Sequence, residues 1–472
     1  MAQFLDIPVE LLPIIFSFVL KPHYLTVLCL VNKTFNVFAT PVLYGRVCVF
    51  PWHRDAKSKF VSLFCTLADY PRLAVHVRNL DIRVFPKGLH SSFSHLSLLD
   101  LCVRAIKNCV NLKSCTWTRD GSLHATVLES LSSDCPQLEE LEINGNSVGY
   151  DPVVLTRFQK LQKISLIMPN RSVLDTLPAW MFAAGARLRS LTITCKASAH
   201  VTDAFLELLS SYLTDLEHLF IVGCSKVTHR GIGALVAGNR KGLLTLNLEG
   251  LSQSFDIGTF KNVCHHTQAL RRLRSITLTV HVHTTIIEWT RNVKDLLETA
   301  PLEVFQLYST DELGDFPIPD DFWKGIAATR GSRFKRFSVY RIQMTLAALQ
   351  SICSRCPRLE QLLVVVDQRD LIAIAPFLAP AENLRTLHIN THGKARGSPM
   401  SPSIMMQTVL DIVSHCSLTL THFGCDTTAW QASWQHVQRV VHLDENGEKY
   451  TLPTLVPREN PDIPEQFLVV RA

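Results

Sequence analysis

The segment LEHLFIVGCSKVTHRGIGAL, residues 216–235, decides the fold class of this 472-residue chain. It begins with aliphatic residues at Leu216, Leu219 and Ile221, which are separated first by two variable positions and then by one. In an extended strand, alternate side chains point to the same face, so Leu219 and Ile221 would face a core and the residues between them would face away. A helical pattern follows from Val227, and the segment predicts a strand followed by a helix.

The same spacing recurs along most of the chain. Clear copies begin at Leu138, Leu161, Leu188, Leu216, Leu243, Leu273, Leu302, Phe334, Leu359 and Leu384, and weaker copies begin at Val77, Leu112 and Leu420. A single copy would be uninformative, because this spacing is also common in amphipathic helices. Many copies, starting about 29 residues apart on average, instead indicate a repeated strand–helix unit that buries its apolar face by stacking on its neighbours.

This pattern resembles the leucine-rich repeat. The resemblance implies an α/β solenoid, a horseshoe of parallel strands and helices, with about 12–13 irregular repeats across residues 77–425. The unit quoted above resembles the cysteine-containing subtype, in which the Cys of a Gly-Cys turn, here Cys224, is a small buried residue. Cys135, Cys356 and Cys416 fall near the ends of helices that precede other strands, so we expect them to pack rather than to react.

Residues 5–44, LDIPVELLPIIFSFVLKPHYLTVLCLVNKTFNVFATPVLY, do not fit the repeat. Their apolar spacing predicts three short helices, the first capped by Asp6, the second beginning near Tyr24 and the third ending near Pro41. A helical cap on the solenoid is one interpretation, because repeat arrays need a polar cap. The segment is more apolar than such a cap, however, and its large side chains indicate a surface covered by a partner.

The segment resembles a small all-α F-box, from Ile7-Pro8 through LVNKTFN at residues 30–36 to PVLY at residues 41–44. Ile7 stands where fungal and animal F-boxes commonly carry Leu. With irregular repeats behind it, the chain is similar to basidiomycete-type F-box proteins. The adaptor-facing residues that the resemblance implies, some of which must belong to the F-box core, are Leu5, Pro8, Leu11, Ile15, Leu25, Leu28, Val31 and Phe35.

The resemblance also implies a function. F-box proteins dock on a Skp-type adaptor, and through it on a cullin, of an SCF-type ubiquitin ligase, while their second domain holds a protein substrate. Such a chain would be no enzyme itself, and it would need no cofactor. The alternative is a leucine-rich-repeat scaffold that binds proteins outside ubiquitin ligation.

Composition narrows the classes of partner and compartment. Lys and Arg total 47 and Asp and Glu total 41, a small surplus that argues against nucleic acid as a partner. No apolar run approaches the ~20 residues that cross a membrane, and the first ten residues lack the basic start of an export signal. We therefore expect a soluble protein of the cytoplasm, the nucleus or both, with reduced thiols.

Metal and catalytic motifs are weak. The pair Cys353 and Cys356 lacks a second pair at zinc-site spacing, so core packing is the favoured interpretation. His281 and His283 would share one face of a strand, but no further ligand stands beside them. The phosphate-loop, serine-hydrolase and zinc-protease motifs are absent from the sequence. A metal-dependent enzyme is therefore the weakest of the hypotheses, and no metal ligand is assigned.

The residues between the strand aliphatics would line the substrate surface. Most are Ser, Thr and other polar residues, which are also ordinary solvent-facing strand residues. The aromatic and Arg members are of the types that dominate binding surfaces, and the candidate substrate-binding residues are Phe220, Tyr308, Arg336 and Tyr340. Basic residues across 330–341 favour an acidic or phosphorylated substrate segment, although a charge run is more often a solvated face.

These patterns divide the chain into an F-box at residues 1–46, a transition at 47–76, the solenoid at 77–425 and a C-terminal part at 426–472. The transition combines a polar link with a helical stretch through Leu67. Beyond the solenoid, alternating residues at 437–443 and 450–456 flank Asn446-Gly447 and predict a capping hairpin, followed by a loose tail.

Overall fold

A computed structural model describes residues 8–19, 21–51, 55–86, 95–119, 121–196, 199–281, 283–313, 318–392, 402–425, 435–443 and 449–457. The chain forms two compact units. Unit 1 contains residues 1–200 and 212–215, and unit 2 contains residues 201–211 and 216–459.

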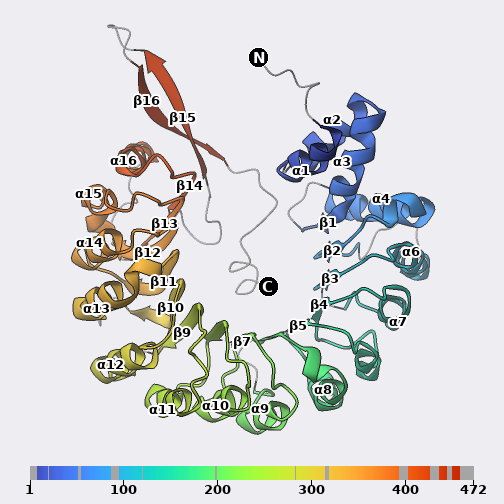
Figure 1. The fold of residues 1–472 in the computed structure, drawn as a ribbon, viewed down its shortest axis with the longest axis horizontal. Coiled ribbons are helices and arrows are strands. Elements are labelled where there is room, and N and C mark those ends of the chain that lie inside the picture. The colour runs from blue at the N-terminus through green and yellow to red at the C-terminus, as the bar shows by residue number, and fades with distance from the viewer. Residues whose placement is uncertain are drawn as a thin grey trace. The chain divides into compact units, whose positions relative to one another are not determined.

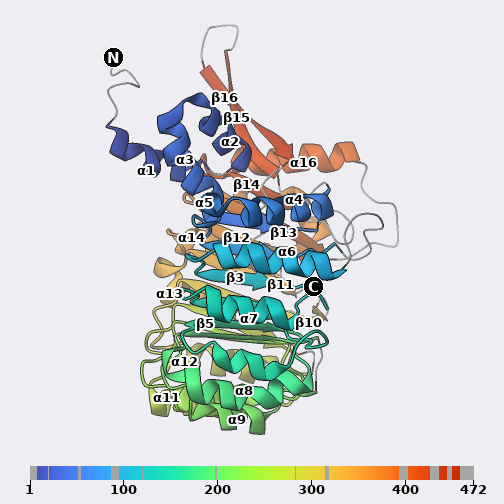
Figure 2. The ribbon, with the colours of Figure 1, turned by 90° about the vertical axis from the view of Figure 1, so that its right-hand side faces the viewer.

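Unit 1 opens with helices and continues as alternating strands and helices (Figure 1). The helical elements are η2 (Val9–Leu11), α1 (Leu12–Ser17), α2 (Pro22–Val31), α3 (Lys33–Gly45), α4 (Ala56–Asp69), α5 (Pro71–Ala74), α6 (His95–Asn108), α7 (Ala125–Asp134), η3 (Pro152–Arg157), α8 (Arg171–Ala184) and η4 (Gly185–Arg187). The strands are β1 (Arg46–Val49), β2 (Asn79–Ile82), β3 (Ser114–Trp117), β4 (Glu140–Asn144), β5 (Lys163–Ile167) and β6 (Ser190–Thr194). Each strand from β1 to β6 pairs in parallel with the next, and α6, α7 and α8 follow one another along one side of the sheet (Figure 2).

Unit 2 repeats the same plan. Its helical elements are α9 (Asp203–Ser210), α10 (His229–Ala237), α11 (Ile257–Thr267), α12 (Ile286–Leu296), α13 (Asp320–Arg330), η5 (Gly331–Arg333), α14 (Leu346–Arg355), η6 (Gln368–Ala373), α15 (Ala375–Leu378) and α16 (Pro402–His415). Its strands are β7 (His218–Val222), β8 (Thr245–Glu249), β9 (Ser275–Val280), β10 (Val304–Leu313), β11 (Arg336–Gln343), β12 (Gln361–Asp367), β13 (Thr386–His392), β14 (His422–Cys425), β15 (Gln435–Leu443) and β16 (Lys449–Pro457). Strands β7 to β14 pair in parallel and in chain order, so the fold is a leucine-rich-repeat solenoid.

The parallel register aligns the repeat aliphatics into continuous buried rows. Leu219 lies opposite Leu246, which lies opposite Ile276, and Phe305 continues the row. All four side chains are fully buried, as the strand phase in the sequence predicted. Burying a side chain of this size stabilises the fold by ~1.5–3 kcal/mol, so these rows hold successive repeats together.

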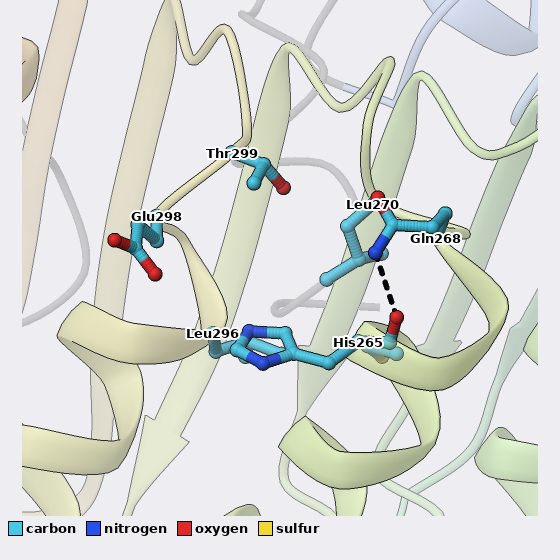
Figure 3. A pocket seen from close by; sticks show the side chains of 7 residues that line it. His265, Gln268, Leu270, Leu296, Glu298 and Thr299 are labelled. Atoms are coloured by element: carbon cyan, nitrogen blue, oxygen red, sulfur yellow. Dashed lines mark hydrogen bonds between the residues drawn. The ribbon is translucent and has the colours of Figure 1, made fainter.

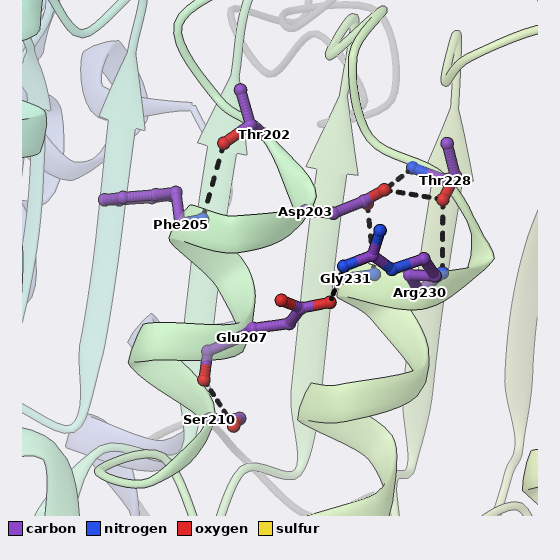
Figure 4. A network of polar contacts seen from close by, with 8 residues as sticks. All are labelled: Thr202, Asp203, Phe205, Glu207, Ser210, Thr228, Arg230 and Gly231. Atoms are coloured by element: carbon purple, nitrogen blue, oxygen red, sulfur yellow. Dashed lines mark hydrogen bonds and ion pairs between the residues drawn. The ribbon is translucent and has the colours of Figure 1, made fainter.

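Side-chain caps connect the helices of neighbouring repeats (Figure 4). The hydroxyl of Thr202 caps α9 by accepting from the Phe205 amide at 3.4 Å. Asp203 lies in the first turn of α9, and its carboxylate accepts three hydrogen bonds from the start of α10. Two come from Thr228, the N-cap of α10, whose amide lies at 2.8 Å and whose hydroxyl lies at 2.6 Å. The third comes from the Gly231 amide at 3.0 Å. These bonds satisfy amides at the α10 N-terminus that have no partner within the helix. A Cβ at Gly231 would lie 2.7 Å from the Asp203 carboxylate, so the glycine permits this close approach.

The cysteines at the repeat turns and helix ends pack in the core. Cys224 is fully buried, and Cys135, Cys356 and Cys416 are also buried. Burial raises the pKa of Cys135 and of Cys356 to about 12. The thiolate is the reactive form of Cys, so these thiols are poor nucleophiles at neutral pH.

Three boundaries differ from the sequence-based expectation. The parallel sheet begins at β1, which pairs with β2, whereas the repeats were expected to begin at residue 77. The polar link predicted in the transition is shorter than the sequence indicated, because α4 already begins at Ala56. Helix α3 continues through Pro41 to Gly45 instead of ending near this proline. The predicted hairpin is present as the antiparallel pair β15 and β16, whereas its turn and the tail lie outside the described residues.

Candidate functional site

The three N-terminal helices of unit 1 enclose a small core. Leu12 and Phe16 of α1, Leu25 of α2 and Ala39 of α3 are buried together. Phe35 packs edge-on against Phe16, with ring centroids 5.2 Å apart. The N-terminus of α3 is fixed locally, because the side chain of its cap, Asn32, accepts a hydrogen bond from the Phe35 amide at 2.8 Å.

The first two of these helices also carry exposed apolar side chains that take no part in this core. In the first helix the exposed residues follow an i, i+3, i+4, i+7 pattern, and Phe18 at its end is 78% exposed. In α2 the exposed residues occupy the side away from the core, and Leu30 is 81% exposed. We call these exposed apolar side chains of the two helices together the docking face, and they are Leu11, Ile14, Ile15, Phe18, Tyr24, Val27, Leu30 and Val31.

The structure divides the predicted adaptor-binding residues into two groups. Pro8, Leu11, Ile15 and Val31 are exposed and available to a partner. The other described members pack in the core, namely Leu25, which is buried, and Leu28 and Phe35, which are partly buried against it. The side chains of these three residues pack between the helices. Leu5 lies outside the described residues.

Five members of the docking face were not among the predicted adaptor-facing residues, namely Ile14, Phe18, Tyr24, Val27 and Leu30. The sequence nevertheless contains a signal for the members on α2. An ordinary surface helix has one apolar stripe, and a helix that is apolar on nearly all sides is usually buried. Helix α2 is apolar around most of its circumference, yet only Leu25 in it is fully buried. Its remaining apolar side chains therefore lie on a surface suited to a partner.

The second candidate surface is the face of the unit 2 sheet opposite the helices, here called the helix-free face (Figure 1). Tyr308 of β10 lies directly opposite Tyr340 of β11. Arg336 lies four residues before Tyr340 in the same strand, and residues at even spacing in a strand share a face. These three predicted residues therefore lie together. Phe220 lies on β7 and is separated from β10 by β8 and β9.

Arg336 is held in place by its own strand. Its Nε donates to the Ser338 hydroxyl at 3.2 Å. Its Nη2 atom is buried and has no hydrogen-bond partner among the described residues. Burial raises the pKa of the neighbouring Tyr340 hydroxyl, and the Arg336 guanidinium opposes part of that rise. The Arg336 side chain thus joins the Tyr pair in one partly desolvated surface.

Two further charged residues, Glu249 and Arg341, complete this surface. The backbone of Arg341 has a φ of 57°, a left-handed conformation, and its guanidinium carbon lies 5.7 Å from the centre of the Tyr308 ring. Burial raises the pKa of Glu249 on β8 to about 7, and the Arg341 charge opposes part of that rise. Sequence periodicity could not place Arg341, because its orientation depends on the left-handed backbone. We call Glu249, Tyr308, Arg336, Tyr340 and Arg341 the tyrosine–arginine patch.

The helix-free face is less exposed than the sequence predicted. Thr277, Ser338 and His388 were expected to face solvent, but all three are buried. Short side chains on a strand are covered by longer ones on neighbouring strands, which lie only about 4.8 Å away. Thr277 and Ser338 flank the longer Gln306 of β10 in the register.

The basic residues across 330–341 do not form one patch. The Lys335 ammonium pairs with the Glu303 carboxylate at 2.8 Å. The Arg330 guanidinium donates to the backbone carbonyl of Glu298. Arg336 and Arg341 instead belong to the tyrosine–arginine patch. Of the basic residues across 330–341 named here, only Arg336 and Arg341 therefore remain candidates for a joint phosphate-binding cluster.

The helix side of unit 2 holds a pocket of about 220 Å³ beside the C-terminal ends of α11 and α12 (Figure 3). Its lining residues are Cys264, His265, Gln268, Leu270, Leu296, Glu298 and Thr299. A ring nitrogen of His265 lies 2.9 Å from the Asp295 carbonyl oxygen, and the Gln268 amide donates to the His265 carbonyl at 2.7 Å. Burial raises the pKa of the Cys264 thiol far above its ordinary value, which disfavours the reactive thiolate.

Among the described residues, no group of three or more His, Cys, Asp or Glu side chains is arranged to hold a metal ion. His281 is buried whereas His283 is exposed, so the two do not form a joint pair. Cys353 and Cys356 are both buried in the core.

No helix within the described ranges is long and apolar enough to cross a bilayer.

No family model matches the sequence, and no curated protein matches it. Among solved structures, the chain is similar to the leucine-rich repeat-containing protein LegL7 from Legionella pneumophila, with 12% identity, a TM-score of 0.40, and coverage of 65% of this chain and 98% of that one. It is also similar to a chain of the Rad7 and Elc1 complex in yeast, with 14% identity, a TM-score of 0.40, and coverage of 74% and 92%. Likenesses this weak carry no functional argument.

Proposed function

We propose that this chain is the substrate-recognition subunit of an SCF-type cullin–RING ubiquitin ligase. In this proposal its N-terminal helices act as an F-box that binds a Skp-type adaptor, and through it a cullin, in the cytoplasm or the nucleus. The repeat domain holds a protein substrate. The chain performs no catalysis itself and raises the local concentration of the substrate beside the ubiquitin-transferring enzyme.

The observation that carries this proposal is the docking face. Its eight large apolar side chains lie on two short helices whose core is formed by other residues. Exposing so many apolar groups costs free energy, and soluble proteins rarely keep such a surface unless a partner covers it. The F-box resemblance of residues 5–44 gives that partner a chemistry, because a Skp-type adaptor is the protein that an F-box binds.

The helix-free face of unit 2 supports the substrate-binding half of the proposal. Parallel strands of a solenoid form one continuous platform, so a partner can contact several repeats at once. The tyrosine–arginine patch supplies Tyr and Arg, which are enriched where most of the binding free energy is concentrated. The patch lies on repeats of unit 2, whereas the docking face lies on the first helices of unit 1.

The proposal is tested by recovering the tagged full chain from cells in which the proteasome is inhibited. We expect a Skp-type adaptor and a cullin to co-purify with the wild-type chain and to be lost from a Phe18→Ser, Leu30→Ser double variant. Proteins recovered with the repeat domain should accumulate ubiquitin only with the wild-type chain. An adaptor without a cullin would favour the scaffold alternative, and the absence of both would contradict the proposal.

A further inference from the structure

The positive charge of unit 2 is concentrated at the edge where its strands begin. Six segments connect helices α10 to α15 with strands β8 to β13, namely residues 238–244, 268–274, 297–303, 331–335, 356–360 and 379–385. They contain nine Lys or Arg and four Glu residues, a surplus of five, whereas the whole chain has a surplus of only six. The rest of the chain is therefore close to neutral.

The segments lie side by side at this edge. The amides of Arg274, Glu303, Lys335 and Glu360 each donate to a carbonyl of the preceding segment at 2.8–2.9 Å, and so form one continuous row. Within this row the Glu303 carboxylate lies 3.7 Å from the Arg274 guanidinium and 2.8 Å from the Lys335 ammonium. These three charges therefore largely satisfy one another.

The basic residues that precede this row in the segments are not satisfied in the same way. Arg272 donates to the Lys241 carbonyl at 3.1 Å. The other five side chains form no hydrogen bond or ion pair with any described residue. All six residues are exposed, so a partner can reach them. We call them the basic rim, and they are Arg240, Lys241, Arg271, Arg272, Arg333 and Arg358.

The pocket at the ends of α11 and α12 opens within this rim (Figure 3). It lies between segment 268–274, which carries two arginines of the rim, and segment 297–303, which carries none. Leu270 and Leu296 form apolar walls, and exposed polar residues surround them. Its volume of about 220 Å³ is below the ~300–1,000 Å³ of small-molecule sites, so it suits one apolar side chain.

The composition of this edge favours a polypeptide over a nucleic acid. Glu298 lies at the pocket, and Glu303 and Glu360 lie in the row beside the rim, so an evenly charged phosphate backbone would meet repulsion along it. Single-stranded nucleic acids also stack on exposed aromatic rings, and no Phe, Tyr or Trp is exposed in the described part of unit 2. A polypeptide can instead place carboxylates opposite the arginines and an uncharged residue opposite Glu298.

We propose that the basic rim and its pocket bind an extended acidic segment of a partner protein, in which Asp or Glu residues stand on both sides of one apolar residue that enters the pocket. Neighbouring strands lie about 4.8 Å apart, so the rim from β8 to β12 spans about 19 Å, the length of about six extended residues. Guanidinium groups bind carboxylates through paired hydrogen bonds. The rim belongs to neither the docking face nor the helix-free face, so this inference goes beyond the proposed function.

The test uses the full chain and the fluorescein-labelled peptide Asp-Asp-Gly-Leu-Gly-Asp-Asp, with binding measured by fluorescence anisotropy. One comparison peptide has Asn in place of every Asp, and another has Ser in place of Leu. The acidic Leu peptide should bind about tenfold or more tightly than the Asn peptide, and this preference should shrink as salt is added. It should bind about tenfold more tightly than the Ser peptide, because the Leu side chain is removed from water.

Variants separate the rim from a general charge effect. Arg271→Gln with Arg333→Gln should weaken binding of the acidic peptide about tenfold. The matched control, Lys226→Gln with Arg291→Gln, removes the same charge from exposed positions elsewhere in unit 2 and should stay within about threefold of the wild type. Thr299→Phe places a ring at the pocket and should abolish the preference for Leu over Ser while keeping that for Asp over Asn.

Several results would overturn the inference. These are equal binding of the Asp and Asn peptides, equal binding of the Leu and Ser peptides, and an equal loss of affinity in the control pair. Tighter binding of a short DNA duplex or of phosphatidylserine vesicles than of the acidic peptide would also overturn it, because the rim would then serve another polyanion. Adaptor and cullin recovery should be unchanged in Arg271→Gln with Arg333→Gln, so failure here leaves the proposed function intact.

Discussion

Replacing Phe18 and Leu30 by Ser tests the docking face quantitatively. Phe18 is 78% exposed and Leu30 is 81% exposed in the free chain, so a partner that covers them would remove nearly all of both side chains from water. Burying a side chain of this size contributes ~1.5–3 kcal/mol, so the pair would contribute ~3–6 kcal/mol to binding. The dissociation constant should therefore rise by about two to four orders of magnitude. Folding stability should change by no more than ~0.5 kcal/mol, because both side chains are already exposed.

The assay is isothermal titration calorimetry of the full chain with a purified Skp-type adaptor, combined with thermal unfolding of each variant. The matched control is Phe182→Ser with Leu418→Ser, because these residues are 78% and 75% exposed, have the same side chains and lie outside the docking face. The control should bind the adaptor like the wild type. A test variant that binds within about threefold of the wild type, or a control that loses as much affinity, would refute the reasoning.

Three further predictions concern the repeats. Leu246→Ala should lower the free energy of unfolding by ~2–5 kcal/mol in urea denaturation, because the Leu246 side chain is fully buried. Arg271 is exposed, so Arg271→Ala should change this free energy by no more than ~0.5 kcal/mol. Equal effects of the two substitutions would mean that the strand phase is misassigned. Asp203→Ala should lower the free energy of unfolding by ~1–3 kcal/mol in the same assay, because it leaves two amides at the start of α10 without an acceptor. Glu207→Ala breaks only an exposed ion pair with Arg230 and should lower it by less than ~1 kcal/mol. Folding raises the pKa of Glu249 from 4.5 to about 7, so the folded state holds this proton more tightly and stability is lost as the pH rises through that window. Glu249→Gln should therefore raise the melting temperature at pH 8 and have little effect at pH 4, and a pH-independent difference would contradict the role of burial.

The strand phase of the repeats could be predicted because it depends on a local pattern with a period of two. Leu219 and Ile221 were placed in the core on this basis, and both are fully buried. Strand β1 was missed because it belongs to no copy of the repeat spacing, and it is recognised as part of the sheet only from its pairing with β2. A four-residue strand of this kind is defined by its neighbour rather than by its own sequence.

The docking face could be predicted only in part. Helix α2 has apolar residues on two sides, and sequence alone does not tell which side meets the rest of the unit. Leu25 and Val31 were therefore grouped together, although one is buried and the other is exposed. Similarly, Arg336 was identified by residue type, but the burial of its Nη2 atom depends on which side chains the neighbouring strands bring near it.

The C-terminal hairpin determines how the unit 2 sheet ends. In β16, Pro453 lies opposite Arg439 and Pro457 lies opposite Gln435. A proline has no amide hydrogen, so these positions cannot form the hydrogen-bonded pairs of the antiparallel ladder with β15, and their backbone groups must point to the outer edge of the sheet. That edge therefore lacks two of the amide donors that an additional strand from another molecule would need. Within the described residues, this edge of the sheet is therefore a poor template for a strand from another molecule.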